Sequence, residues 1–324
     1  MKAVLCTHFG GPDDLELKEL PDPVPGAGEV LVAVKAAALN FFDTLLIAGK
    51  YQHKPPFPFS PAAEFSGVVE RVGPDVAAIR SGDRVLGNIG AGAAREKVVA
   101  KAERLIKLPD GLDFDRAAGL TVTYGTTLHA LKDRAQLRPG ETLAVLGAAG
   151  GTGLATIELG KILGARVIAC ASSAEKLAFA REHGADEAVN YTEEDIKDAL
   201  RRLTDGKGVD VVYDPVGGPY AEPAVRALAW GGRYLVIGFA AGEIPKIPIN
   251  LVLLRSSAIV GVFWGAWAER NPQGHRANMA EIALWCLEGK LSAHVHAVYP
   301  LEKTAEAIKA LSNRQVMGKL LLRP

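Results

Sequence analysis

The order of apolar and polar positions predicts two regions of different structure. From Thr142 onward, short apolar runs of strand length alternate with segments of helical periodicity. The runs lie at Thr142–Leu146, Ala165–Cys170, Glu187–Tyr191, Val209–Tyr213, Arg233–Gly238 and Ala258–Val262. Helical patterns such as Ala174–His183 and Glu193–Leu203 separate most of them. This alternation favours a parallel, doubly wound α/β sheet, with the last run at its edge.

The first third of the chain consists of short strand patterns separated by glycine and proline. These patterns lie at Lys2–Cys6, Glu29–Ala36, Phe65–Val72, Arg84–Gly87 and Arg95–Ala100. Such punctuation is typical of a compact, twisted β barrel or partly open sheet. A last strand pattern, Val316–Leu322, follows a helical pattern at Arg276–Glu288 and is expected to return to this β domain. We therefore predict one domain from residues 1–122 and 265–324, with an α/β domain of residues 123–264 inserted in it.

A glycine cluster joins the first apolar run of the α/β region to the helix that follows. It reads Gly147-Ala148-Ala149-Gly150-Gly151-Thr152-Gly153. Glycine and alanine allow a sharp turn and a close approach of the backbone to a ligand. The helix beginning near Gly151–Gly153 directs free N–H groups and its positive dipole end at the turn, which favours a pyrophosphate. The cluster predicts a dinucleotide-binding Rossmann domain; the alternative is a tight turn in a sheet that binds no nucleotide.

The end of the second predicted strand indicates which dinucleotide is bound. An NAD site usually carries Asp or Glu there, to hold the ribose 2′-hydroxyl. This chain has Ser172, Ser173 and Lys176 instead, which can hydrogen-bond and neutralise a 2′-phosphate. Glu175 lies among them and is expected to point outward. We predict NADPH; the alternative is that a serine only caps the next helix and Lys176 is a solvated surface charge.

Composition and charge exclude several classes of function. The chain has 324 residues, 37 Lys and Arg against 37 Asp and Glu, and a net charge of +0. This balance gives no electrostatic basis for binding nucleic acid or an anionic membrane, and no apolar run approaches the length of a membrane span. The N-terminus lacks the apolar core of a signal peptide, and the three cysteines lie far apart. These features favour the cytoplasm.

Motifs along the whole chain carry a family resemblance. They are Leu39–Asp43, Pro61–Val69, Gly82–Val85, Leu120–Tyr124, the glycine cluster, Asn190–Tyr191, Asp214–Gly218 and Gly318–Lys319. In these the chain resembles the medium-chain dehydrogenase/reductase superfamily, and within it the zinc-free quinone oxidoreductase branch that includes zeta-crystallin. The resemblance implies a Rossmann domain inserted in a GroES-like, mainly β catalytic domain. Related reductases are commonly dimers, and an apolar edge strand invites pairing with a second copy, so we expect a homodimer.

Departures from the zinc alcohol dehydrogenases of this superfamily point to the chemistry. Those enzymes carry a cysteine three residues before the aspartate that matches Asp43, and a histidine just before the glutamate that matches Glu64. This chain has Asn40 and Ala63 at these positions, and it lacks the four cysteines of the structural zinc lobe. A zinc site needs three or four converging ligands, so we predict no metal. Without this Lewis acid the expected chemistry is hydride delivery to quinones or activated enones.

The resemblance also implies contacts to NADPH and to the acceptor. The cofactor contacts would be Asn40, Thr123, Ala149, Gly150, Gly151, Thr152, Gly153, Ser172, Ser173, Lys176, Tyr191, Ile237, Gly238, Phe239, Val262, Phe263, Trp264 and Lys319. Each has a plainer alternative: Asn40 could satisfy a turn, and Tyr191 could be a core residue at a strand end.

The candidate acceptor pocket contains Asn40, Leu45, Tyr51 and Trp264. Zeta-crystallin-like enzymes have two tyrosines near the acceptor; Tyr51 matches the second, whereas Leu45 replaces the first. This change favours a flat, hydrophobic acceptor, although any single apolar residue is more often simply core. Two other functions remain open: an enoyl-thioester reductase on the same scaffold, and an NADPH-binding crystallin-like or RNA-binding protein with little turnover.

Overall fold

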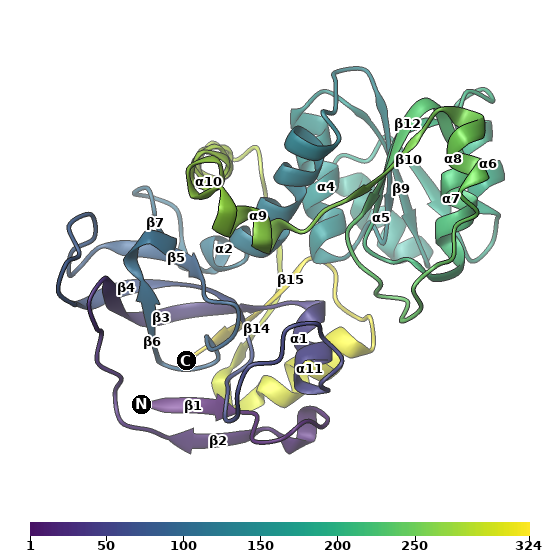
Figure 1. The fold of residues 1–324 in the computed structure, drawn as a ribbon. Coiled ribbons are helices and arrows are strands. Elements are labelled where there is room, and N and C mark those ends of the chain that lie inside the picture. Colours follow the sequence, from purple (N-terminus) through teal and green to yellow (C-terminus); the bar gives the residue numbers. More distant parts are fainter. The chain divides into compact units, whose positions relative to one another are not determined.

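A computed structural model describes all residues from Met1 to Pro324. Contacts within the chain divide it into two compact units: unit 1 is Met1–Val122 with Met279–Pro324, and unit 2 is Thr123–Asn278 (Figure 1). The second boundary follows Asn278, whereas the sequence placed it after residue 264. The reason lies in helix α9 (Trp264–Arg270), whose Trp267 stacks on His129 of unit 2 with ring centroids 4.0 Å apart.

Unit 1 is built on a seven-stranded sheet with the order β14-β15-β3-β4-β5-β7, in which β6 also pairs with β3. Its strands are β3 (Glu29–Leu39), β4 (Glu64–Val72), β5 (Arg84–Asn88), β6 (Lys97–Lys101), β7 (Leu105–Lys107), β14 (Val295–Pro300) and β15 (Lys319–Arg323). A separate pair is formed by β1 (Lys2–Leu5) and β2 (Glu16–Glu19). The C-terminal strand β15 runs antiparallel to β3, with Leu321 opposite Ala38. The predicted return of the C-terminus to the β domain is therefore confirmed.

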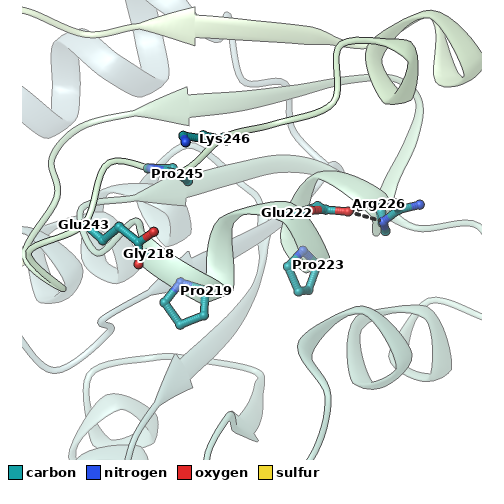
Figure 2. A pocket seen from close by; sticks show the side chains of 8 residues that line it. All are labelled: Gly218, Pro219, Glu222, Pro223, Arg226, Glu243, Pro245 and Lys246. Carbon is teal, nitrogen blue, oxygen red and sulfur yellow. Dashed lines mark hydrogen bonds and ion pairs between the residues drawn. The ribbon is translucent and has the colours of Figure 1, made fainter.

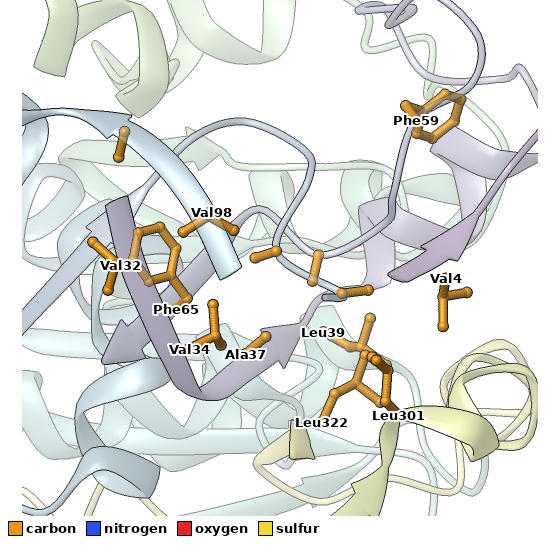
Figure 3. Close-up of a cluster of buried hydrophobic side chains, with 14 of the residues drawn as sticks. Val4, Val32, Val34, Ala37, Leu39, Phe59, Phe65, Val98, Leu301 and Leu322 are labelled. Atoms are coloured by element: carbon orange, nitrogen blue, oxygen red, sulfur yellow. The ribbon is translucent and has the colours of Figure 1, made fainter. Parts of the chain in front are cut away.

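The core of unit 1 lies where these strands meet the N- and C-terminal segments. Figure 3 shows Val32 and Leu39 of β3, Phe65 of β4 and Leu322 of β15 in one buried cluster with Leu301. Three main helices belong to unit 1 as well: α1 (Phe41–Ile47), α2 (Phe114–Ala118) and α11 (Thr304–Ser312). A fourth helix, α10 (Pro272–Leu287), begins in unit 2 and ends in unit 1, and it starts earlier than expected because proline is accepted in a first helical turn.

Unit 2 contains a six-stranded parallel sheet with the order β10-β9-β8-β11-β12-β13. The strands are β8 (Thr142–Leu146), β9 (Arg166–Ala171), β10 (Glu187–Asn190), β11 (Val209–Asp214), β12 (Leu228–Val236) and β13 (Ala258–Gly261). The helices that connect them are α4 (Gly151–Ile162), α5 (Ala174–Glu182), α6 (Ile196–Leu203), α7 (Ala221–Arg226) and α8 (Asn250–Arg255). Counted from β8, this is the strand order 3-2-1-4-5-6 of the Rossmann fold. The predicted doubly wound sheet and its edge strand are confirmed.

Two element boundaries in unit 2 differ from the sequence-based prediction. Strand β12 begins at Leu228 and not at Arg233, because Leu228 already pairs with Val209 before a register shift. Helix α6 begins at Ile196 and not at Glu193, because the Asp195 carboxylate accepts the backbone N–H of Asp198 and caps the helix there. None of the helices in the chain combines the length and the apolarity that crossing a membrane requires.

Candidate active site

The glycine cluster forms the turn between β8 and α4. Gly147 has φ of 62°, a conformation that glycine adopts without strain. A Cβ atom on Gly153 would lie 2.2 Å from the carbonyl oxygen of Gly147, so the first turn of α4 rests directly on the loop. Gly150 caps the helix without a side chain, which leaves the N–H groups of the first turn to a ligand. These N–H groups are the kind that bind a pyrophosphate, and the predicted contact at this turn stays a prediction.

The loop after β11 packs against this turn and is held by a buried carboxylate. Asp214 accepts the backbone N–H groups of Val216 (2.6 Å) and Gly217 (2.8 Å) and the hydroxyl of Tyr234. Burial raises the pKa of Asp214 and also that of Tyr234. Val216 in turn lies so close to Gly147 that a Cβ there would come within 2.9 Å of its Cγ2 atom. This contact lies between β8 and β11, at the switch point where Rossmann domains bind their ligands.

The residues predicted for the adenosine end gather at the carboxyl ends of β9 and β10. The backbone N–H of Tyr191 donates to the carbonyl of Ala171 at 3.2 Å. Ser173 caps α5 by accepting the backbone N–H of Lys176 at 3.3 Å, and its own hydroxyl proton stays available to a phosphate. Glu175 is exposed, as expected. Ser173 is therefore a helix cap, as the alternative reading held. This role leaves a phosphate contact by Ser172 and Ser173 open.

Two further predicted segments follow the carboxyl ends of β12 and β13. They are Ile237, Gly238 and Phe239 after β12, and Val262, Phe263 and Trp264 after β13. The Trp264 side chain is buried within unit 2, where it lies over Gly125 and meets the His275 ring edge-on at 5.5 Å. This packing gives no support to Trp264 as a lining residue of an acceptor pocket. Phe263, in contrast, is 74% exposed.

In unit 1 the polar side chains of Asn40, Glu64 and Lys319 form one buried cluster. The Lys319 ammonium donates to Asn40 Oδ1 at 2.7 Å, to Glu64 Oε1 at 2.8 Å and to the carbonyl of Leu39 at 3.1 Å. Glu64 also accepts Asn40 Nδ2 at 2.9 Å. Its other oxygen accepts the Thr121 hydroxyl at 2.6 Å and the backbone N–H of Val122 at 2.7 Å. In the Glu64–Lys319 ion pair, both carboxylate oxygens and all three ammonium N–H groups thus have hydrogen-bond partners.

This cluster changes the expected role of Lys319. The sequence-based prediction made it a cofactor contact, but all three N–H groups of its ammonium are occupied within unit 1. A direct hydrogen bond from this ammonium to a ligand would need one of these three contacts to break. Sequence reasoning used Glu64 and Thr121 only as parts of motifs and missed them as members of this cluster. The pairing of Glu64 with Lys319 spans 255 residues, and no local pattern signals it.

Asp43 lies beside this cluster and anchors the start of α1. Its carboxylate accepts the backbone N–H groups of Asn40 (2.8 Å) and Ala62 (2.9 Å) and is completely buried. Burial raises the pKa of Asp43 to about 7, although both N–H groups and the charge of Lys319 oppose the shift.

Asp43 is therefore expected to make stability depend on pH. The folded state binds its proton more tightly than the unfolded state, so this stabilisation is complete below the ordinary pKa of 3.8 and is lost as the pH rises through about 7. We expect the unfolding free energy of wild type, minus that of Asp43→Asn, to fall across this window by at most about 1.4 kcal/mol per pH unit. Urea unfolding at a series of pH values measures it, with the exposed Asp110→Asn as control. Parallel curves for wild type and Asp43→Asn would contradict the shift.

The structure does not bring the candidate acceptor residues Leu45 and Tyr51 into one pocket. Tyr51 stacks on Phe42 with ring centroids 5.3 Å apart and 25° between the ring planes. Leu45 instead lines a pocket of about 240 Å³ in unit 1, together with Pro12 and Ile308. Tyr51 does not border that pocket. Their shared role at an acceptor therefore stays a prediction.

A larger pocket of about 580 Å³ lies in unit 2 (Figure 2). Its walls come from the loop after β11, from α7 and from the segment that follows β12, and they carry the Glu222–Arg226 ion pair at 2.6 Å. The lining residues are Gly218, Pro219, Glu222, Pro223, Arg226, Glu243, Pro245 and Lys246. None of them belongs to the predicted cofactor or acceptor site, so this pocket does not support either assignment.

The positions that carry zinc ligands in related alcohol dehydrogenases have no such side chains here. Ala63 is buried and apolar, and Asn40 is engaged by Glu64 and the Lys319 ammonium. In the whole chain no three His, Cys, Asp or Glu side chains converge in a way that could hold a metal ion.

Comparisons with known proteins agree with this arrangement. Residues 26–110 match the alcohol dehydrogenase GroES-like domain, and residues 151–279 match the zinc-binding dehydrogenase domain. Quinone oxidoreductase-like protein 2 of Rattus norvegicus is 39% identical over 323 residues, which are 99% of this chain and 91% of that protein.

Two solved structures cover the whole chain. Escherichia coli quinone oxidoreductase complexed with NADPH superposes with a TM-score of 0.93 at 28% identity, covering 100% of both chains. An NAD-dependent alcohol dehydrogenase superposes with a TM-score of 0.91 at 35% identity, again over 100% of both. The chain therefore belongs to the medium-chain dehydrogenase/reductase superfamily, in its quinone oxidoreductase branch, and is an oxidoreductase.

Proposed function

We propose that this oxidoreductase uses NADPH to reduce quinones or activated enones, without zinc. The observation that carries the proposal is the buried Asn40–Glu64–Lys319 cluster, because Asn40, which stands where zinc relatives have a ligand cysteine, is held by an ammonium and a carboxylate. The NADPH complex of the similar Escherichia coli quinone oxidoreductase supports the choice of cofactor.

In this function, two segments of unit 2 bind the cofactor. The Gly147–Gly153 turn and the first turn of α4 bind the pyrophosphate through backbone N–H groups. Ser172, Ser173 and Lys176 bind the 2′-phosphate. When bound, NADPH would supply the hydride, and a proton from solvent would complete the reduction of a quinone to its hydroquinone. The protein orients the reactants and excludes water, which needs no nucleophilic side chain.

The cofactor preference is expected to depend on Lys176. NADPH should bind at least about tenfold more tightly than NADH, the value of one charge-assisted contact. Lys176→Ala should weaken NADPH binding about tenfold and leave NADH binding unchanged. Fluorescence titration measures both affinities, and Lys161→Ala, which removes a lysine charge from α4, is the matched control. Equal affinity for the two cofactors, or a Lys176→Ala change that weakens both alike, would contradict the predicted NADPH preference.

The absence of a zinc requirement is a second expected result. Protein purified without chelators should contain far less than one zinc per chain, and NADPH oxidation by a quinone should be unchanged after treatment with a chelator. Elemental analysis and a steady-state assay on the same preparation test this. Stoichiometric zinc, or loss of activity that zinc restores, would reopen alcohol oxidation.

Two other functions are distinguished by turnover. An enoyl-thioester reductase on this scaffold would oxidise NADPH fastest with an enoyl thioester. A crystallin-like or RNA-binding protein would bind NADPH and turn over none of these acceptors. The neutral charge of the chain counts against the RNA alternative.

A further inference from the structure

The orientation of the Asn40 side chain is fixed by its neighbour Lys319. A lysine ammonium can only donate hydrogen bonds, so the atom that it meets at 2.7 Å must be the amide oxygen Oδ1. The amide nitrogen Nδ2 then faces Glu64 Oε1 at 2.9 Å. Because a carboxylate accepts, both contacts define the same orientation of the amide.

This orientation leaves one hydrogen-bond donor of the cluster without a protein partner. Nδ2 carries two N–H groups, and Glu64 accepts only one of them. The three N–H groups of Lys319 and both oxygens of Glu64 are occupied. Asn40 is only 7% exposed, and a buried donor left unmatched costs about as much as a lost hydrogen bond. One N–H group of Asn40 is therefore available to an acceptor atom of a ligand.

Electrostatics explain why the amide is held by an ion pair. Glu64 and Lys319 are both buried, at 0% and 5% exposure, and each charge compensates the other. A neutral hydroxyl can reverse its hydrogen bond, whereas an ammonium and a carboxylate cannot. The pair therefore prevents the amide from turning over, which would place an oxygen where the free N–H now lies.

We propose that Lys319 and Glu64 are positioning residues that hold Asn40 with one Nδ2–H directed at an acceptor oxygen of a bound ligand. The proposal rests on the function proposed above. The oxygen is either the carbonyl of the quinone or enone, or an oxygen of the nicotinamide riboside end of NADPH. Either oxygen can accept a hydrogen bond from the Asn40 amide. The amide keeps its proton in both cases.

A double-mutant cycle tests the positioning role. Asn40→Ala should lower kcat with a quinone about 10- to 100-fold, the usual effect of losing one hydrogen bond that strengthens during the reaction. Lys319→Met should lower kcat to a similar extent. If Lys319 acts through Asn40, Lys319→Met should cost nothing further in the Asn40→Ala background. Independent, additive losses would overturn the proposal.

A matched control separates positioning from general destabilisation. Ile308→Val removes a methylene group from the buried core of unit 1 without removing any hydrogen bond of the cluster, and should leave kcat unchanged while lowering the melting temperature. A similar loss of kcat in Ile308→Val and Lys319→Met would assign Lys319 a merely structural role, and so contradict the proposal.

Nuclear magnetic resonance tests the same idea without a Lys319 variant, should that variant not fold. The two Nδ2 protons of Asn40, assigned by their absence in Asn40→Ala, should have different shifts. The chemical shift of the Nδ2 proton that is hydrogen-bonded to Glu64 should stay unchanged when a ligand is added. The shift of the other Nδ2 proton should change. A shift on adding NADP⁺ alone identifies the cofactor oxygen, and a shift only after a quinone is added identifies the acceptor carbonyl.

The outcomes keep this proposal apart from the proposed function. If no quinone or enone is reduced but NADP⁺ still shifts the free proton, the proposed function fails and the positioning role stands. If quinones are reduced and neither ligand moves either proton, the positioning role fails and the function stands.

Discussion

Replacing Gly153 with alanine is expected to weaken NADPH binding by at least about 100-fold, because a misplaced pyrophosphate loses several backbone hydrogen bonds. The new Cβ atom would lie 2.2 Å from the carbonyl oxygen of Gly147 and 2.7 Å from the Cα atom of Ala148. Both neighbours are backbone atoms, so the turn and the helix must separate. The same overpacking should lower the unfolding free energy by about 1–3 kcal/mol.

Isothermal titration of NADPH measures the loss of affinity, and urea unfolding shows that the variant is folded. Gly265→Ala serves as the control, since a Cβ there meets no atom within 4 Å and alanine favours the helix in which it lies. NADPH binding by Gly153→Ala at wild-type affinity would contradict the placement of the pyrophosphate at this turn.

The second large effect concerns assembly, where we expect a homodimer joined through β13. This strand is at the edge of the sheet and its Ile259 is exposed. Further exposed apolar side chains of unit 2 lie on both sides of β13 in the sequence: Ile249, Leu253, Leu254 and Phe263. An apolar edge strand in water favours pairing with a second copy, and a two-fold arrangement would cover both edges. The alternative cover is Arg134, whose guanidinium donates to the Gly261 carbonyl at 3.1 Å.

The register of β13 decides which substitution tests this interface. The N–H of Val262 donates to Val236 of the neighbouring strand, so by alternation the N–H of Val260 also faces inward and that of Ile259 faces the free edge. Ile259→Pro should therefore remove a donor from the dimer contact without disturbing β12.

Light scattering should give twice the chain mass of 34.2 kDa for the wild-type dimer. For Ile259→Pro it should give the mass of a single chain. Thermal unfolding of the variant monitors the fold. A wild-type monomer, or a dimer that Ile259→Pro leaves intact, would exclude this interface.

The sequence was sufficient for the fold and for the backbone geometry of the glycine turn because both depend on local patterns. Apolar runs of strand length alternating with helical segments predict a parallel sheet, and the strands of unit 2 lie close to the predicted positions. The glycine cluster predicts close packing, and the contact of Gly153 with the Gly147 carbonyl provides it.

The rest of the site depends on contacts that no local pattern records. The family resemblance implied a cofactor contact for Lys319, whereas its ammonium bonds Asn40, 279 residues away, and Glu64, 255 residues away. The family resemblance placed Trp264 at the cofactor and the acceptor, but its side chain is buried against Gly125. Leu45 lies only a few positions before Tyr51, yet Leu45 borders a pocket with Ile308 that Tyr51 does not border.

The central claim is that the chain transfers reducing equivalents from NADPH to quinones or enones without a metal. A stopped-flow screen on chelator-treated protein tests it most directly, by following the loss of NADPH absorbance with quinones, enones, enoyl thioesters and, as a negative control, buffer alone. We predict rapid NADPH oxidation with quinones or enones, slower oxidation with NADH, and no dependence on added zinc. No turnover with any of these acceptors, or turnover that requires zinc, would contradict the claim.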